Sequence, residues 1–197
     1  IEILKADTYA FSDLSALGGK AVTVKSTLSD RDDVILTREN NINGNGNRAT
    51  YENLKIQFAA NQCVNGISHS PNGGAATADV KFNNCVISGF LYGYDKMTFT
   101  ECEFKLGAEE SKLNMTTYAA KITCTNCTFS ASVNVYWDEN SIPATGAQRS
   151  IVFDKCAFKK ANDAPKTIAA VLLKTGNSVN ADYDVVLKDC TLSGYEN

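Results

Sequence analysis

Cysteine is the residue of this chain whose number and spacing point most directly to chemistry. The 197 residues include seven cysteines but only one histidine, His69. Cys124 and Cys127 form a C-x-x-C pair, a spacing that can hold a metal or do redox chemistry, but a structural metal site needs a second pair of ligands. The sequence has no second pair of this kind, and we predict no metal site. A disulfide, a redox role and a stack of buried thiols stay open. The stack is preferred because free cysteine behaves as a small apolar residue.

Aromatic residues are the second group that could do chemistry. Tyr92, Tyr94, Tyr136 and Trp137 occur in two short segments, and these four are the predicted binding residues. If both segments are strands of one parallel sheet, the rings lie on one side of successive strands, where they could stack against sugar rings. Side chains alternate between the two faces of a strand, so packing in the core or in a loop is the competing interpretation.

An internal repeat supplies the elements that position these residues. Each copy has apolar residues five and three places before an anchor residue and two places after it. The two apolar pairs have the periodicity of a strand, and the step of three between them marks a bend. The residue before the anchor is Asn or Asp in four of six copies, which indicates a left-handed backbone conformation. Each copy is therefore predicted to be two short strands that meet at a tight turn, and the six anchors are Leu54, Cys85, Cys102, Cys127, Cys156 and Cys190.

The spacing between copies predicts a third strand and loops of variable length. Successive anchor cysteines are 17, 25, 29 and 34 residues apart, which is typical of coils with a constant cross-section. We expect the third strands at 66–67, 90–93, 118–120, 133–136 and 168–173. The loops are then expected at 68–79, 105–117, 138–150, 159–167 and 174–184.

The repeat resembles the right-handed parallel β-helix of the pectin-lyase-like superfamily, and most of all its adhesin-like or uncharacterised secreted bacterial domains. The units VKFNNCVI, MTFTECEF, ITCTNCTF, IVFDKCAF and VVLKDCTL carry the resemblance. It implies an all-β solenoid with three short strands per coil, an internal cysteine ladder and about eight or nine coils. Residues 1–197 would form one domain, with entry coils over 1–48 and six repeat units over 49–192. A further coil or additional domains are expected to follow in a longer protein.

The resemblance covers proteins with several activities, including lyases, hydrolases, adhesins and phage tailspikes. Its hydrolases place pairs of Asp on adjacent strands, and the sequence shows no such pairs. Its lyases use Ca²⁺ with a basic residue, and a lyase built from Arg149 or Lys96 with Asp95 and Asp138 is the alternative. We expect no catalytic residues and no cofactor, with Ca²⁺ entering only in the lyase alternative.

The expected function is therefore a non-catalytic extracellular module for adhesion or carbohydrate binding. Its partners would be glycans or a host or cell-surface ligand, and the alternative is a lyase or hydrolase that acts on acidic polysaccharide. A net charge of −3 gives no electrostatic basis for nucleic-acid binding. No apolar run reaches the 18 residues that a membrane span needs. Location outside the cell, secreted or on the surface of a bacterium, is expected from the resemblance alone.

Overall fold

The computed structural model describes residues 1–10, 20–38, 48–58, 79–89, 91–93, 96–106, 113–118, 121–137, 149–162, 169–175 and 183–195. Within these ranges all regular structure is β-strand, and no helix is present. Every pairing between the strands is parallel. The protein is therefore built from parallel sheets, as the repeat predicted.

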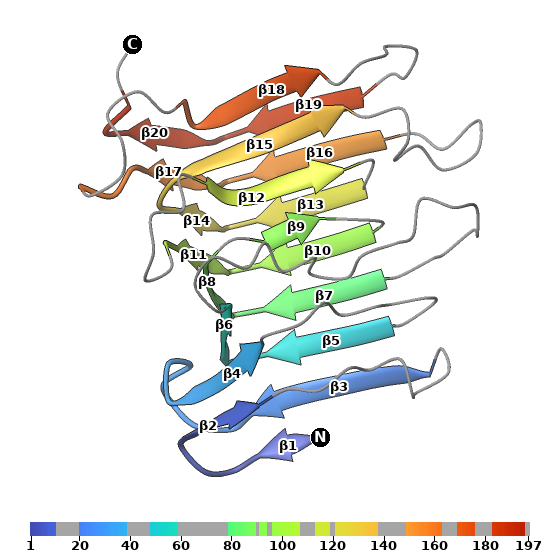
Figure 1. Ribbon diagram of the computed structural model, residues 1–197, viewed down its shortest axis with the longest axis vertical. Coiled ribbons are helices and arrows are strands. Elements are labelled where there is room, and N and C mark those ends of the chain that lie inside the picture. Colours follow the sequence, from blue (N-terminus) through green and yellow to red (C-terminus); the bar gives the residue numbers. More distant parts are fainter. Residues whose placement is uncertain are drawn as a thin grey trace.

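The strands form two long sheets and one short sheet. Within each sheet the strands follow one another along the longest axis of the molecule (Figure 1). The first long sheet has the order β1 (Glu2–Ile3), β3 (Ala21–Ser26), β5 (Arg48–Glu52), β7 (Asp79–Asn83), β10 (Lys96–Thr100), β13 (Lys121–Thr125), β16 (Arg149–Asp154) and β19 (Tyr183–Lys188). The second long sheet has the order β2 (Asp7–Ala10), β4 (Val34–Arg38), β6 (Lys55–Phe58), β8 (Val86–Ser88), β11 (Glu103–Lys105), β14 (Thr128–Phe129), β17 (Ala157–Lys159) and β20 (Thr191–Ser193). The short sheet contains β9 (Leu91–Gly93), β12 (Leu113–Tyr118), β15 (Ser132–Trp137) and β18 (Val171–Thr175).

The chain visits these sheets in a fixed order. From β7 to β18 it passes through the first long sheet, the second long sheet and the short sheet, and then returns to the next strand of the first. Parallel neighbours in this part of the chain are therefore joined by a crossover that includes two other strands. The β7–β8–β9 and β10–β11–β12 series are two successive examples.

The core lies where five of the six copies of the repeat placed it, whereas Leu187 and Leu192 of the last copy are exposed. The apolar positions of the repeat are buried throughout β5 to β17. Rings from successive strands stack within the first long sheet, with centroids 5.2 Å apart for Tyr51 and Phe82 and 4.8 Å apart for Phe82 and Phe99. A second stack runs through the second long sheet, where Phe129 lies 4.4 Å from Phe104 and 5.0 Å from Phe158. Stacked rings of this kind each contribute about 0.5–1.5 kcal/mol beyond the area they bury.

The bend between the paired strands has the predicted left-handed backbone in all six copies. The residue before each anchor has a φ between 49° and 57°. Asn and Asp tolerate this conformation better than other residues with a side chain, which explains their use in four copies. Glu101 and Lys155 adopt it in the other two. The backbone N–H of this residue donates to a carbonyl of the next strand, as from Asn84 to Thr100 at 2.8 Å, so the bend leaves the ladder intact.

The short sheet departs from the prediction at one strand. Residues 105–117 were expected to form a loop, with a strand only from 118, but β12 begins at Leu113. The register shifts between Leu113 and Met115, where Asn114 forms a bulge. The buried Asn114 side chain accepts a hydrogen bond from the N–H of Ala131 at 2.6 Å. A buried Asn interrupts the apolar alternation, which is why the pattern hid the first half of this strand.

The other third strands follow the expectation within a few residues. β9, β15 and β18 overlap the segments predicted at 90–93, 133–136 and 168–173. The segment predicted at 66–67 lies outside the described residues.

Candidate functional site

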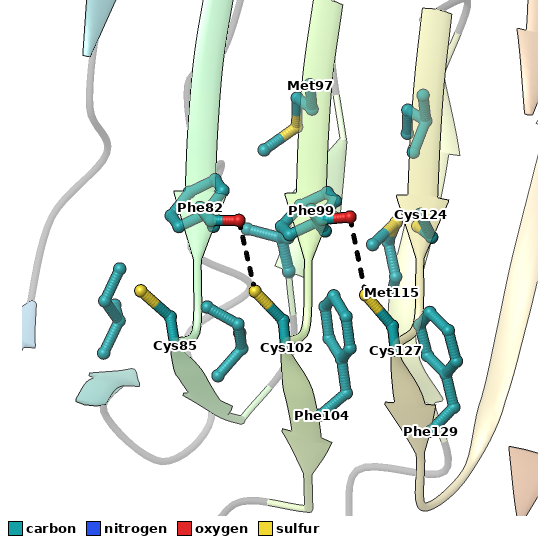
Figure 2. Close-up of a cluster of buried hydrophobic side chains, with 14 of the residues drawn as sticks. Phe82, Cys85, Met97, Phe99, Cys102, Phe104, Met115, Cys124, Cys127 and Phe129 are labelled. Atoms are coloured by element: carbon teal, nitrogen blue, oxygen red, sulfur yellow. Dashed lines mark hydrogen bonds between the residues drawn. The ribbon is translucent and has the colours of Figure 1, made fainter. Parts of the chain in front are cut away.

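The anchor cysteines form a row along the inside of the molecule. Figure 2 shows Cys85, Cys102 and Cys127 side by side, each just before a strand of the second long sheet and beside the stacked phenylalanine rings. These three and Cys156 are buried, whereas Cys190 is half-buried. The six cysteines in the described part of the chain are free thiols. Cys63 and the one histidine, His69, lie outside that part.

Each thiol of the row faces two backbone carbonyl oxygens. Cys102 Sγ lies 3.3 Å from the oxygen of Phe82 on the preceding strand and 3.4 Å from the oxygen of Thr100, two residues before it. The same pair of contacts recurs at all five anchor cysteines, over distances of 3.3–3.6 Å. Leucine, found at the sixth anchor, Leu54, is also apolar and buried but has no proton to donate. The S–H group thus gives a physical reason for cysteine at five of the six anchors.

The carbonyl contacts of the row favour protonated thiols, whereas hydrogen bonds among the thiols and burial shift their pKa values in both directions, down for Cys102 and Cys156 and up for the others. Burial raises the pKa of Cys124 and of Cys190 above the ordinary value for a thiol. A hydrogen bond with the thiol of Cys102, together with burial, raises the pKa of Cys85. The neighbours of Cys102 act to lower the pKa of that thiol, but its two carbonyl contacts favour the protonated form. Protonated buried thiols are poor nucleophiles and poor metal ligands.

Among the described residues, no group of three or more Cys, His, Asp or Glu side chains is arranged to hold a metal ion. The row of thiols lies among the apolar side chains of the core, so we looked for a binding surface on the outside of the molecule.

The predicted aromatic residues fall on two strands of the short sheet. Tyr92 lies in β9, and Tyr136 and Trp137 lie at the end of β15. Tyr92 is in register with Thr116 of β12, and Thr116 with Asn134 of β15. Tyr136 is thus two positions further along the sheet than Tyr92, and positions two apart share a face of a sheet. Tyr94, like the side chains of the other three, lies outside the described part of the structure.

The residues of the lyase alternative are described only in part. Lys96 begins β10, and its Nζ lies 3.1 Å from Asp79 Oδ2. Arg149 is the first residue of β16, on the same sheet but two strands away. Asp95 and Asp138 fall outside the described residues.

A cluster of charged residues that the sequence analysis missed covers part of the second long sheet. Arg31, in the segment that joins β3 to β4, places Nη2 2.9 Å from Glu103 Oε2. Asp32 lies 3.9 Å from Lys55 Nζ and 3.7 Å from Lys105 Nζ, and Lys105 lies 3.5 Å from Glu103. We call these five residues the Arg31 cluster.

Arg31 also forms hydrogen bonds with the bends of two neighbouring copies of the repeat. Its Nη1 donates to Asn84 Oδ1 and to the carbonyl oxygen of Glu101, both at 3.1 Å. Asn84 in turn donates through Nδ2 to Asn53 Oδ1 at 2.9 Å. Asn53 and Asn84 form a line of amide side chains along successive bends, and Glu101 holds the next position of that line. The Arg31 guanidinium continues the hydrogen bonding there. The only local signal in the sequence is the Arg31-Asp32-Asp33 run of charges.

The chain matches no protein-family model, no curated protein and no solved structure. In the described residues, no helix has the length and apolar character needed to cross a membrane.

Proposed function

We propose that the chain is a non-catalytic extracellular module that binds carbohydrate, for adhesion or display, through the outer surface of the short sheet. In this proposal the chain is a right-handed parallel β-helix of the pectin-lyase-like kind, one domain with three strands per coil and about eight or nine coils. The recurring order of the three sheets supports this architecture. A secreted or surface-attached bacterial protein is the setting that the resemblance implies.

The register of the short sheet is the observation that carries the proposed function. It fixes Tyr92 and Tyr136 two positions apart along parallel strands, with Thr116 and Asn134 in register with Tyr92. Parallel strands lie about 4.8 Å apart and rise about 3.3 Å per residue. The two tyrosines therefore belong to one rigid lattice of fixed dimensions. A tyrosine has only two side-chain torsions, so a ring carried by such a backbone loses little entropy when it stacks on a sugar.

The chemistry of the proposed surface suits neutral sugars. A tyrosine combines an apolar ring with a hydroxyl that can exchange hydrogen bonds with sugar hydroxyls. Hydroxyl and amide groups of Thr116 and Asn134 add hydrogen-bonding capacity to the same row of positions. Trp137 follows Tyr136 directly, at a position of the opposite alternation, so its contribution to binding is a separate question for the experiment.

A glycan array probed with the purified protein tests the proposal. Tyr92→Ala and Tyr136→Ala are each expected to weaken binding about fivefold, since one stacked ring contributes about 1 kcal/mol. Tyr9→Ala at the far end of the molecule is the matched control and should bind as the parent does. Absence of binding by the parent, or equal loss in the control, would overturn the proposal.

The same wells distinguish the enzymatic alternative. A lyase acting on acidic polysaccharide releases an unsaturated product that absorbs in the ultraviolet. We expect no rise in absorbance. A rise that disappears when a chelator removes Ca²⁺ would show that the protein is a lyase instead.

A further inference from the structure

The outer surface of the first long sheet carries a row of basic side chains. Positions of β5, β7, β10 and β13 alternate between buried apolar residues and outward residues. Each of these four consecutive strands has one exposed basic residue among its outward positions. We call them the basic row: Arg48, Lys81, Lys96 and Lys121.

The strand register places the basic row along the stacking direction. Arg48, Asp79, Lys96 and Lys121 are direct register partners on successive strands. Lys81 lies two positions further along β7, in register with Thr98. With about 4.8 Å between strands, the four cations span about 15 Å on a flat surface.

The charges of the basic row are not balanced by the acids near them. The twelve outward positions of the four strands hold four basic residues and two acids, Glu52 and Asp79, a net charge of +2 in a chain whose net charge is −3. Asp79 pairs with Lys96 at 3.1 Å, and Glu52 Oε1 accepts a hydrogen bond from Asn83. Within the described residues, no ion pair involves the other three cations.

Two lysines of the row are direct neighbours. Lys96 and Lys121 occupy register-paired positions on β10 and β13, where like charges destabilise a sheet. A bound anion would remove this repulsion.

The donors around the row point to the chemistry of that anion. Thr50, Thr98 and Thr123 form the next outward row and are half-buried beside the cations. Ammonium groups and hydroxyls can reach a ligand from several directions, which suits a tetrahedral oxyanion with three free oxygens. A planar carboxylate is matched better by the fork of an arginine, and only one of the four cations is an arginine.

We propose that the basic row binds a linear sulfated polysaccharide, laid across β5, β7, β10 and β13. This site goes beyond the carbohydrate surface proposed for the short sheet and lies on a different sheet. Sulfate groups spaced along an extended chain contact successive cations, and threonine hydroxyls donate to sulfate oxygens. Binding is electrostatic, so it weakens as salt displaces the polymer.

Fluorescence anisotropy with labelled heparin at low salt tests this site. The double variant Lys81→Gln/Lys121→Gln is expected to bind about fivefold to tenfold more weakly, since each exposed charge contact contributes up to about 1 kcal/mol. The matched control is Lys155→Gln/Lys159→Gln, which removes two exposed cations elsewhere and should change binding less than about twofold. The slope of log K against log salt should also fall in the first variant only.

The competing outcomes are distinct. Equal weakening in the two double variants would show that binding follows net charge and would overturn the site. Tighter binding of polyphosphate, single-stranded DNA or polygalacturonate than of heparin would overturn the ligand class. The basic row lies on the first long sheet, whereas Tyr92 and Tyr136 lie on the short sheet. A variant that loses heparin binding but keeps glycan-array binding therefore separates this proposal from the one above.

Discussion

The Arg31 cluster on the second long sheet and the basic row on the first differ in how far their charges are paired. On the second long sheet, the cations of the Arg31 cluster are matched by Asp32 and Glu103 within 2.9–3.9 Å. On the first long sheet, the basic row has one ion pair, between Lys96 and Asp79. The same repeat supplies both surfaces, so the strands alone do not cause the difference.

A connecting segment makes the difference. The segment between β3 and β4 carries Arg31 and Asp32 over the second long sheet, where they bond to β6 and β11 on either side of β8. Val86 of β8 occupies an outward register position between Lys55 and Glu103, yet it is fully buried. The segment between β3 and β4 therefore covers this part of the second long sheet. The basic row is open, which is the arrangement expected of a surface that meets a ligand.

Loss of the Arg31 side chain should have the largest effect on this comparison. Arg31→Ala removes hydrogen bonds to Asn84, Glu101 and Glu103 and is expected to lower the free energy of unfolding by about 2 kcal/mol. Lys81→Ala, on the open surface, should change it by less than about 0.5 kcal/mol. Urea denaturation of the two variants measures both values. Equal losses would show that the two surfaces do not differ in the way proposed.

A substitution in the bend beside the Arg31 cluster is expected to increase stability instead. Glu101 holds a left-handed conformation with a φ of 57°, and Glu101→Asn should raise the free energy of unfolding by about 1 kcal/mol, because Asn tolerates this conformation better. Lys155→Asn relieves the same cost at a bend remote from Arg31 and serves as the control. A gain at Lys155 with none at Glu101 would mean that the acidic side chain has a stabilising role near Arg31. Thermal denaturation compares the two variants.

The parts of the fold that follow from local chemistry could be predicted from the sequence. Residue alternation located the buried positions of the paired strands, and Asn or Asp before the anchor indicated the left-handed bend found at Asn53, Asn84, Asn126 and Asp189. Both signals are contained within eight residues. β12 was placed too late because the bulge at Asn114 buries an amide in a strand that otherwise alternates.

The outer surfaces depend on contacts that a local pattern does not contain. Arg31 meets Glu103 across 72 residues of sequence, so nothing near Arg31 identifies its partner. The basic row was within reach of the repeat, because Arg48, Lys96 and Lys121 each stand six places before an anchor. The apolar positions of the repeat define the core, whereas these cations stand in a polar column beside it. The aromatic residues of the short sheet form no such column, since Tyr92 stands seven places after its anchor and Tyr136 stands nine places after its own.

Reversal of one charge separates stability from binding on the open surface. Lys121→Glu replaces a like-charged neighbour of Lys96 with an opposite one and should raise the free energy of unfolding by about 0.5 kcal/mol, while it weakens heparin binding. Lys159→Glu, on the second long sheet, should leave heparin binding nearly unchanged. Urea denaturation and anisotropy on the same samples provide the two readouts. A loss of stability in Lys121→Glu would show that Lys121 already has a stabilising partner.

Salt should have the smallest effect, and opposite consequences at the two surfaces. Raising NaCl from low concentration to about 1 M shortens the screening length to about 3 Å, which weakens the ion pairs of the Arg31 cluster and the repulsion within the basic row. The parent protein should therefore lose only a few tenths of a kcal/mol, because exposed pairs contribute little each. Arg31→Ala, which lacks the shortest of the cluster's four ion pairs, should lose less stability than the parent, since salt then has less attraction to screen. Urea denaturation at the two salt concentrations measures the difference. If both proteins lost stability equally, the attraction within the Arg31 cluster would not be the term that salt screens.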